Sequence, residues 1–452
     1  MLIFIFASAV SFINSFNIIR IDRKKFLKRL LLICYILPFF VLSFNFIPGV
    51  LKLLYIPYLI AGAISLTAYN YRPNIPRQYF IIMAMIFLFI LSALLNRVYY
   101  FTIPLSLVRL IIPFLLLYIF SKIDFKKSDI IKGVQYFMVI GLIQVPIQFY
   151  QYLFLPQFAS VDISRVDIAM GTFGLKQSGT LAVYYVLLYL LLFVFKSEIF
   201  ESSLIFIAVL VVLTAGFLIT FSGGGLIILV GMFSILFLFN KNNKNIKIIL
   251  PIALMLISVV VFWGKFESAY VAEDQLGLVD YAQGRTATEL ASMLNSDLII
   301  EGNGSRAYGL FRSLNYANNS AGGLTFGGGP GTLLQAQVLE SSINIKSINN
   351  YYDVFGFDTI VNTWAYLIGE LGFIFLFLFM YYFIYPCLKF RRLKINGYNV
   401  YYPLLVVFFM YSFYYNIVFD YQFLLIFTFC LTQFKNFSSD SSFNYSLNTT
   451  DK

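Results

Sequence analysis

Histidine is absent from this chain of 452 residues, and cysteine occurs only three times. The first absence removes the commonest general base near neutral pH and the commonest metal ligand. Cys34 and Cys430 lie inside long apolar runs and Cys387 lies at the end of another, so no disulfide framework is expected. A zinc site on the loops of the outer face would have to consist of carboxylates alone, because no cysteine lies there, and zinc disfavours such a site. Any catalysis therefore has to use Arg, Lys, Asp, Glu, Tyr or backbone groups.

Charged residues are also scarce. They make up 12% of the chain, whereas hydrophobic residues make up 60% and the mean hydropathy is +0.82. Soluble domains average about 25% charged residues, so this composition predicts an integral membrane protein. A span needs about 20 apolar residues, and such windows predict an all-α polytopic protein with about 12–13 transmembrane helices. The windows lie near residues 2–19, 30–48, 51–70, 79–96, 101–121, 131–154, 179–195, 203–221, 225–239, 248–263, 360–387, 401–416 and 421–434.

The net charge of +11 does not indicate nucleic-acid binding, because the basic residues are concentrated in every second connection between the windows. By the positive-inside rule those connections are cytoplasmic, which places the N-terminus and the connections 155–178 and 264–359 outside. The first window is followed rather than preceded by its positive cluster, which favours a retained span over a cleavable signal peptide.

Four parts follow from this topology. Residues 1–263 form transmembrane helices 1–10, residues 264–359 a large periplasmic loop domain, residues 360–434 the C-terminal transmembrane helices, and residues 435–452 a disordered cytoplasmic tail rich in Ser, Asn and Asp. The large loop is rich in glycine, and loops held by a rigid scaffold commonly carry chemistry.

Few cations remain on the predicted outer face, so each one is a candidate ligand for an anion. Arginine suits phosphate and diphosphate groups because its charged fork binds them through two parallel hydrogen bonds. The alternative is that an exposed arginine only keeps a loop solvated. The outer cations are Arg97, Arg165, Lys176, Lys265, Arg285, Arg306, Arg312 and Lys346.

Arg165 precedes Gly171-Thr172-Phe173-Gly174 and Lys176, just before the chain enters the next apolar window. Glycines beside a cation at the start of a helix favour an anion site made of backbone N–H groups. A flexible re-entry turn is the alternative. The segment Thr220–Gly225 is interpreted as a packing hairpin, with a functional site as the alternative.

Residues 305–318 predict a short amphipathic helix that carries Arg306, Tyr308 and Arg312. The glycine run of residues 327–331 follows it and permits close approach of the backbone to a ligand. A P-loop is excluded, because no Gly-Lys-Ser/Thr closes the run.

Three ionisable residues near the membrane are further candidates. Arg109 and Glu370 lie within apolar windows, where such groups usually face a polar cavity, and both are predicted to line one. Asp358 lies at the membrane boundary, where partial desolvation favours a general base. An ordinary aspartate at a helix N-terminus is the alternative for Asp358.

The order of these motifs resembles the bacterial O-antigen polymerase and ligase superfamily, in particular the Wzy-type polysaccharide polymerases. The resemblance covers residues 155–385 in motif order and nearly the whole chain in topology. It rests on Arg165 with Gly171-Thr172-Phe173-Gly174, on Thr220-Phe221-Ser222 with two glycines, on Ser305-Arg306 leading to Gly327–Gly331, and on Asn362-Thr363-Trp364 with Gly369-Glu370-Leu371-Gly372.

The resemblance implies a GT-C-like, metal-independent glycosyltransferase without a cofactor, which acts on undecaprenyl-diphosphate-linked glycans at the periplasmic face of the bacterial inner membrane. Arg165 and Arg306 would hold the diphosphate, with Arg312 and Lys176 as further ligands. The loop's tyrosines and asparagines, Tyr308 among them, would line the sugar cavity.

The expected reaction is an inverting transfer of the growing lipid-linked glycan onto a newly flipped lipid-linked repeat unit. Asp358 is the first candidate for the carboxylate that orients or deprotonates the acceptor hydroxyl, and Glu301 is the second. The expected partners are the lipid-linked donor and acceptor, the lipid bilayer and a chain-length regulator; nucleic acid is not expected.

Two positions depart from the superfamily pattern. Ligases tend to place a histidine where this chain has Val361, and relatives often place an arginine where it has Gly223. The first departure disfavours an O-antigen ligase, and the second removes the outer hairpin from the diphosphate site. The ligase stays open as an alternative, as does a flippase or other transporter of lipid-linked oligosaccharides, for which two related halves and short loops are typical.

Overall fold

The structure, a computed structural model, is mostly helical. It describes residues 27–28, 31, 35, 77–98, 102–123, 125–154, 171–173, 178–220, 222–240, 306–333, 362–416 and 420–439. Its elements are α5 (Arg77–Leu95), α6 (Thr102–Lys122), α7 (Lys127–Phe154), α8 (Ser178–Val194), α9 (Lys196–Ile199), α10 (Ser203–Ile219), α11 (Gly223–Asn240), α15 (Arg306–Asn318), α16 (Gly323–Phe326), α18 (Thr363–Lys389), β1 (Lys394–Ile395), β2 (Tyr398–Asn399), α19 (Tyr401–Tyr414) and α20 (Tyr421–Ser439).

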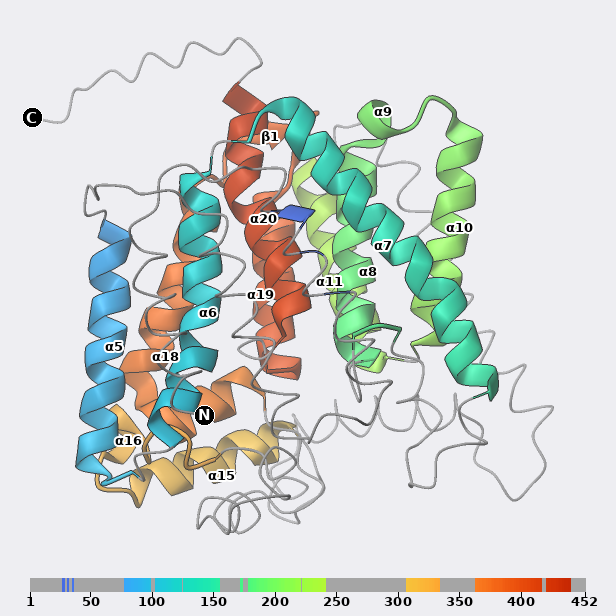
Figure 1. Cartoon of the computed structure of the whole chain (residues 1–452). Helices are drawn as coiled ribbons and strands as arrows, with labels where there is room; N and C mark the ends of the chain where they lie inside the picture. Colours follow the sequence, from blue (N-terminus) through green and yellow to red (C-terminus); the bar gives the residue numbers. More distant parts are fainter. Residues whose placement is uncertain are drawn as a thin grey trace, which may run out of the picture.

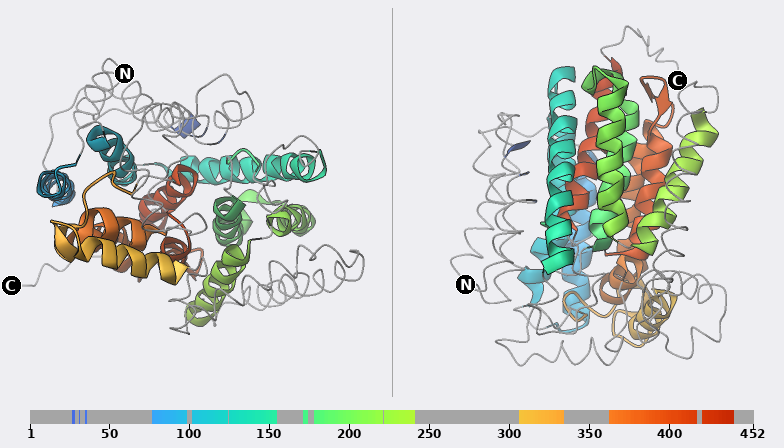
Figure 2. Two further views of the ribbon diagram at one scale, coloured as in Figure 1. Left: turned by 90° about the horizontal axis from the view of Figure 1, so that it is seen from below. Right: turned by 90° about the vertical axis from the view of Figure 1, so that its right-hand side faces the viewer.

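The long helices run roughly along one axis and form a bundle (Figure 1). Seen along that axis, α5, α6 and α18 lie on one side, α7, α8, α10 and α11 on the other, and α19 and α20 between them (Figure 2). Helix α15 lies across one end of the bundle, at a steep angle to the other helices (Figure 1). It packs against α18.

One end of the bundle, here called the basic end, gathers lysines and arginines. The Lys127 ammonium lies 4.5 Å from the ring centroid of Phe437, which brings the start of α7 to the end of α20. Asn396, between β1 and β2, donates a hydrogen bond of 2.8 Å to the carbonyl of Val194 at the end of α8. Helices α15 and α16 lie at the opposite end, the α15 end (Figure 1). The basic end carries Lys126, Lys127, Lys196, Lys389, Arg391, Arg392 and Lys394.

Two of the described helices are long and apolar enough to cross a membrane, over Lys127–Leu153 and Thr363–Lys389, and five shorter helices are strongly apolar. Apolar side chains also cover outer faces of the bundle, as Phe80, Phe87 and Leu94 on α5 do, with exposed fractions of 64–70%. Soluble monomers rarely expose continuous apolar faces of this kind. These faces suit a lipid environment.

The bundle core is rich in aromatic side chains. Helix α8 is buried along its whole length, because it packs against α7, α10, α11 and α20. Tyr184 on α8 lies within 5.3 Å, centroid to centroid, of both Tyr35 and Phe173. This packing joins the early part of the chain to the middle of the bundle.

Helices α5 to α8, α10, α11 and α18 to α20 agree with nine of the apolar windows to within about five residues, and the amphipathic helix predicted for residues 305–318 is present as α15. The windows near 2–19, 30–48, 51–70 and 248–263 lie outside the described residues, apart from Leu31 and Tyr35, as does most of the predicted loop domain 264–359. Helix α20 continues to Ser439, past the expected start of the disordered tail at residue 435. Phe437 explains the extension, since it packs on Phe195 at a centroid distance of 4.9 Å. The β1–β2 hairpin is an addition to the expected all-α fold. Its turn residues Asn396 and Gly397 have φ of 49° and 84°, as a two-residue hairpin turn requires.

Candidate functional site

Helix α18 is interrupted at Gly372, where φ is 77° and ψ is 179°. A Cβ at this position would overlap the carbonyl oxygen of Thr325 in α16, and a Cβ at Gly327 would lie 2.5 Å from the carbonyl carbon of Glu370. The backbones of α16 and α18 therefore touch, and only glycine permits both the conformation and the contact. We call this contact, over Thr325–Leu333 and Gly369–Gly372, the glycine joint.

The interruption frees carbonyl groups of α18, since a helix end leaves its last carbonyls without intrahelical donors. The segment after α16 fills these positions. The N–H of Gly328 donates to the carbonyl of Gly369 at 2.7 Å, and the N–H of Gly329 donates to the carbonyl of Glu370 at 2.9 Å. The glycine run thus replaces the missing turn of the helix.

The Glu370 side chain completes the joint. It is fully enclosed, with 0% of its surface exposed. Its Oε2 accepts a hydrogen bond of 2.8 Å from the N–H of Gly331, and its Oε1 accepts one of 3.0 Å from the N–H of Leu333. The sequence prediction placed Glu370 in the lining of a polar cavity, whereas both of its oxygens bind the backbone of the glycine run. A buried acid needs such donors, because an unpaired buried charge is very costly.

Helix α5 holds the same segment from the other side. The Ser92 hydroxyl donates to the carbonyl of Phe326 at 2.6 Å. The Asn96 side chain donates to the carbonyl of Gly327 at 2.9 Å and accepts from the N–H of Gly322 at 3.2 Å. Two helices far apart in sequence thus fix the chain between α15 and the end of the joint.

Helix α15 turns a face of small residues, Gly309, Ser313 and Ala317, to the interior. A Cβ at Gly369 would lie 3.4 Å from the Ser313 hydroxyl, so α15 approaches α18 closely. Phe311 is 52% exposed on the outer face of α15, and Arg312 is half-buried.

Tyr316 couples α15 to the glycine run, since a Cβ at Gly328 would overlap its ring. Burial raises the pKa of the Tyr316 hydroxyl; a hydrogen bond with Thr332 opposes this shift and the charge of Glu370 adds to it. The Tyr316 hydroxyl therefore stays protonated near neutral pH.

A second buried acid lies near the α15 end, where α8 and α20 begin and α19 ends. The Tyr411 hydroxyl is hydrogen-bonded to the carboxyl group of Asp420 and, at 2.8 Å, to the hydroxyl of Thr180. Burial raises the pKa of Asp420 to about 7, although the hydrogen bonds with Tyr411 and Thr180 act to lower it. We call these three residues the Asp420 cluster. A carboxyl group with this pKa exchanges protons near neutral pH.

Tyr415 connects the Asp420 cluster to neighbouring elements. Its ring lies 5.2 Å from that of Tyr411, and its hydroxyl lies 3.0 Å from that of Ser222. Its carbonyl accepts from the N–H of Thr363 at 3.1 Å. A Cβ at Gly225 would lie 2.5 Å from Ala182. Ser222 and Gly225 therefore pack closely on Tyr415 and on α8.

The Gly171–Phe173 segment is clamped by glutamines of α7. Gln151 accepts from the N–H of Gly171 at 2.7 Å and donates to its carbonyl at 2.8 Å. Gln144 accepts from the N–H of Thr172 at 2.7 Å. The N–H groups of Gly171 and Thr172 are therefore used within the protein, while Gly174 and Lys176 of the predicted anion site lie outside the described residues.

Five of the predicted site residues lie within described helices. Arg306, Tyr308 and Arg312 lie on α15, beside the joint that contains Glu370, and Arg109 lies within α6. Arg165, Lys176, Glu301 and Asp358 lie outside the described residues. Within the described ranges, no group of three or more His, Cys, Asp or Glu residues is placed to hold a metal ion.

Sequence reasoning missed the Asp420 cluster. The available signal was that Asp420 is the single charged residue in the stretch 401–434. An acid isolated between two apolar runs indicates a buried polar partner. Tyr411 could not be identified as that partner from the sequence, because several other tyrosines lie close to it in the chain.

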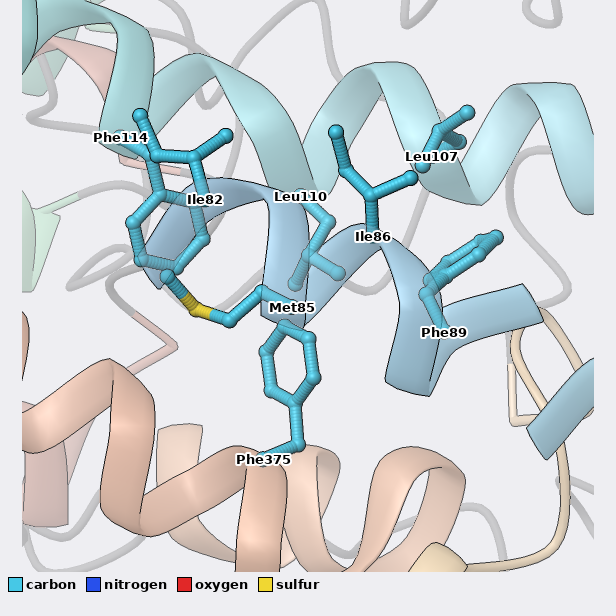
Figure 3. A pocket seen from close by; sticks show the side chains of 8 residues that line it. All are labelled: Ile82, Met85, Ile86, Phe89, Leu107, Leu110, Phe114 and Phe375. Carbon is cyan, nitrogen blue, oxygen red and sulfur yellow. The ribbon is translucent and has the colours of Figure 1, made fainter. Parts of the chain in front are cut away.

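A small apolar recess lies between α5, α6 and α18. Figure 3 shows that its lining consists of hydrocarbon, aromatic and thioether side chains, among them Met85, Leu110 and Phe375. No polar atom is available there to orient a sugar or a phosphate, so the recess is not a site for chemistry.

Comparison of the chain with family models, with curated proteins and with solved structures finds no match.

Proposed function

We propose that the protein is a polysaccharide polymerase of the bacterial inner membrane, which extends a glycan carried on undecaprenyl diphosphate at the periplasmic face. The observation that carries the proposal is the position of α15. An arginine-bearing amphipathic helix lies across one end of an apolar helix bundle, opposite the basic end.

The charge distribution supports the orientation. By the positive-inside rule, the basic end is cytoplasmic and the α15 end is periplasmic. Helix α15 then lies at the level where lipid meets water. A polyprenyl diphosphate has its charged group at that level and its tail in the hydrocarbon, so cations are needed there.

The reaction that fits is a single displacement. The acceptor hydroxyl attacks the anomeric carbon of the donor glycan, a new carbon–oxygen bond forms, and the bond from that carbon to the diphosphate breaks. The hydroxyl proton passes to a carboxylate, with Asp358 the first candidate and Glu301 the second. Polyprenyl diphosphate leaves with the bonding electron pair.

Arginine side chains would accelerate this step most by contacting the leaving group. Arg306 and Arg165 neutralise the charge that grows on the departing diphosphate oxygens, with Arg312 and Lys176 as further ligands. Preorganised charge of this kind stabilises a transition state without being consumed. The sequence resemblance to the Wzy-type polymerases supports the same assignment.

The test is reconstitution of the purified protein in liposomes with a lipid-linked repeat unit. The wild type should give a ladder of longer lipid-linked glycans. Arg306→Ala and Arg165→Ala should each slow elongation by about 100-fold or more, the usual cost of removing one charge-stabilising group. Arg392→Ala, an exposed arginine at the basic end, should elongate normally.

Two results would count against the proposal. Unchanged elongation in both arginine variants, with normal insertion, would remove the diphosphate assignment. Movement of the lipid-linked unit across the bilayer without lengthening would indicate a transporter, and transfer of the glycan to an acceptor without polyprenyl diphosphate would indicate a ligase.

A further inference from the structure

We propose that Glu370 is a positioning residue: its carboxylate holds α15, and with it the arginines of the diphosphate site, without contacting substrate. This inference rests on the proposed function for its substrate, but the anchoring itself is measurable without any substrate.

The carboxylate is committed to the protein. Both oxygens accept backbone N–H groups, those of Gly331 and Leu333, at 2.8 and 3.0 Å. The side chain is fully enclosed. These two hydrogen bonds tie the side chain of α18 to the segment Gly331–Leu333.

That segment leads directly to α15. Gly328 packs under the ring of Tyr316, and Gly369, which precedes Glu370, lies against Ser313 and Leu333. Asn96, which directly follows α5, ties Gly322 and Gly327 into the same unit. Displacement of the glycine run therefore displaces the helix that carries Arg306 and Arg312.

Glutamate suits this task better than glutamine. A carboxylate offers an acceptor to each of the two N–H groups, whereas a glutamine offers one acceptor and directs its NH₂ group at the other donor. The Glu370→Gln variant therefore loses one hydrogen bond and brings two donors together.

The charge of Glu370 distinguishes a positioning role from a purely electrostatic effect on binding. A negative charge beside a diphosphate site opposes anion binding, so its removal would tighten binding if charge were all that mattered. A positioning role predicts instead that removal of the Glu370 charge weakens the binding of the diphosphate. The Asn96→Ala variant adds a case in which the joint loosens and no charge changes.

The first measurement is amide hydrogen exchange of peptides that cover residues 328–333, in the full-length protein. Glu370→Gln and Asn96→Ala should both raise exchange there and leave α19 unchanged, because the amides lose their fixed acceptors or the support beneath them. Glu201→Gln, the same chemical change at an exposed site, should leave exchange unchanged. Unaltered exchange in Glu370→Gln and Asn96→Ala would overturn the anchoring role whatever the protein's function.

The second measurement is the affinity for undecaprenyl diphosphate in detergent or nanodiscs. Both joint variants should bind about tenfold more weakly, because the helix that carries the arginines is no longer held in place. Glu201→Gln should bind normally. Tighter binding by Glu370→Gln, or unchanged binding despite raised exchange, would overturn the positioning role. Failure of the wild type to bind the lipid, with the exchange result intact, would instead refute the proposed function.

Discussion

Glu370 and Asp420 are both enclosed acids near the same end of the bundle, and the protein satisfies them in different ways. Glu370 is bound by two backbone N–H groups that the glycine joint holds in place. Asp420 is bound by the side-chain hydroxyl of Tyr411, which also binds Thr180. The first acid is held by main-chain groups and the second by side chains from two helices, α19 and α8.

This difference separates what each acid can do. Backbone donors cannot accept a proton or turn away, so the Glu370 contact is a fixed anchor. Hydroxyl groups donate or accept as their partner requires. The Asp420 cluster can therefore respond to pH, and the burial that raises the pKa of Asp420 to about 7 places this response near neutrality.

The largest expected effect comes from breaking the glycine joint. Gly372→Ala should lower the free energy of unfolding by about 3–5 kcal/mol, because a positive φ is strained for alanine and the new Cβ overlaps the Thr325 carbonyl. The measurement is thermal unfolding in detergent.

Gly323→Ala is the matched control for this prediction. Gly323 also has a positive φ, of 58°, but a Cβ there would meet no atom within 4 Å. Gly323→Ala should therefore lower the free energy of unfolding only by the cost of the strained backbone conformation, about 1 kcal/mol. Equal losses in the two variants would show that the contact with Thr325 contributes nothing.

The next effect distinguishes the two acids by pH. Burial raises the pKa of Asp420 from 3.8 to about 7, so in this range the folded state keeps a proton that the unfolded chain releases. Stability is then greatest at low pH and falls as the pH rises from about 4 to about 7, by up to about 4 kcal/mol from this group.

Asp420→Asn should remove this part of the pH dependence, because the amide cannot ionise. Unfolding curves recorded from pH 4 to pH 8 check it, with Glu201→Gln as the variant that keeps the wild-type slope. If the slope is the same in Asp420→Asn and the wild type, Asp420 does not titrate in this window.

The positions of the described long helices could be predicted from sequence, because a span requires one long apolar run and each run can be recognised without knowledge of its neighbours. Helix α15 could be predicted as well, from its amphipathic pattern after a glycine-rich start. The β1–β2 hairpin carried a signal in its Asn396-Gly397 turn, but it lies within a short basic connection and was overlooked.

The glycine joint could not be predicted, and the reason is physical. The donors that bind Glu370 are main-chain N–H groups, which every residue except proline has, so no side-chain pattern marks them. Gly372 lies inside an apolar run that is otherwise typical of an unbroken span. The contact between α16 and α18 joins segments some 45 residues apart, and local propensity does not report such contacts.

The smallest expected effect tests the hydroxyl that distinguishes the Asp420 cluster from the joint. Tyr411→Phe removes a hydrogen bond that lowers the pKa of Asp420, so the upper limit of the pH-sensitive range should move above 7. The variant should also lose about 1–2 kcal/mol of stability, because the hydroxyl of Thr180 and the carboxyl group of Asp420 lose a partner.

Tyr401→Phe is its counterpart on the same helix, since the Tyr401 hydroxyl is buried without a hydrogen bond to any residue that the structure describes. Removal of an unsatisfied hydroxyl should cost nothing or stabilise slightly. Unfolding of both variants across the pH range compares them directly, and a similar loss in each would mean that the packing of the ring, rather than the bond to Asp420, accounts for the contribution of Tyr411.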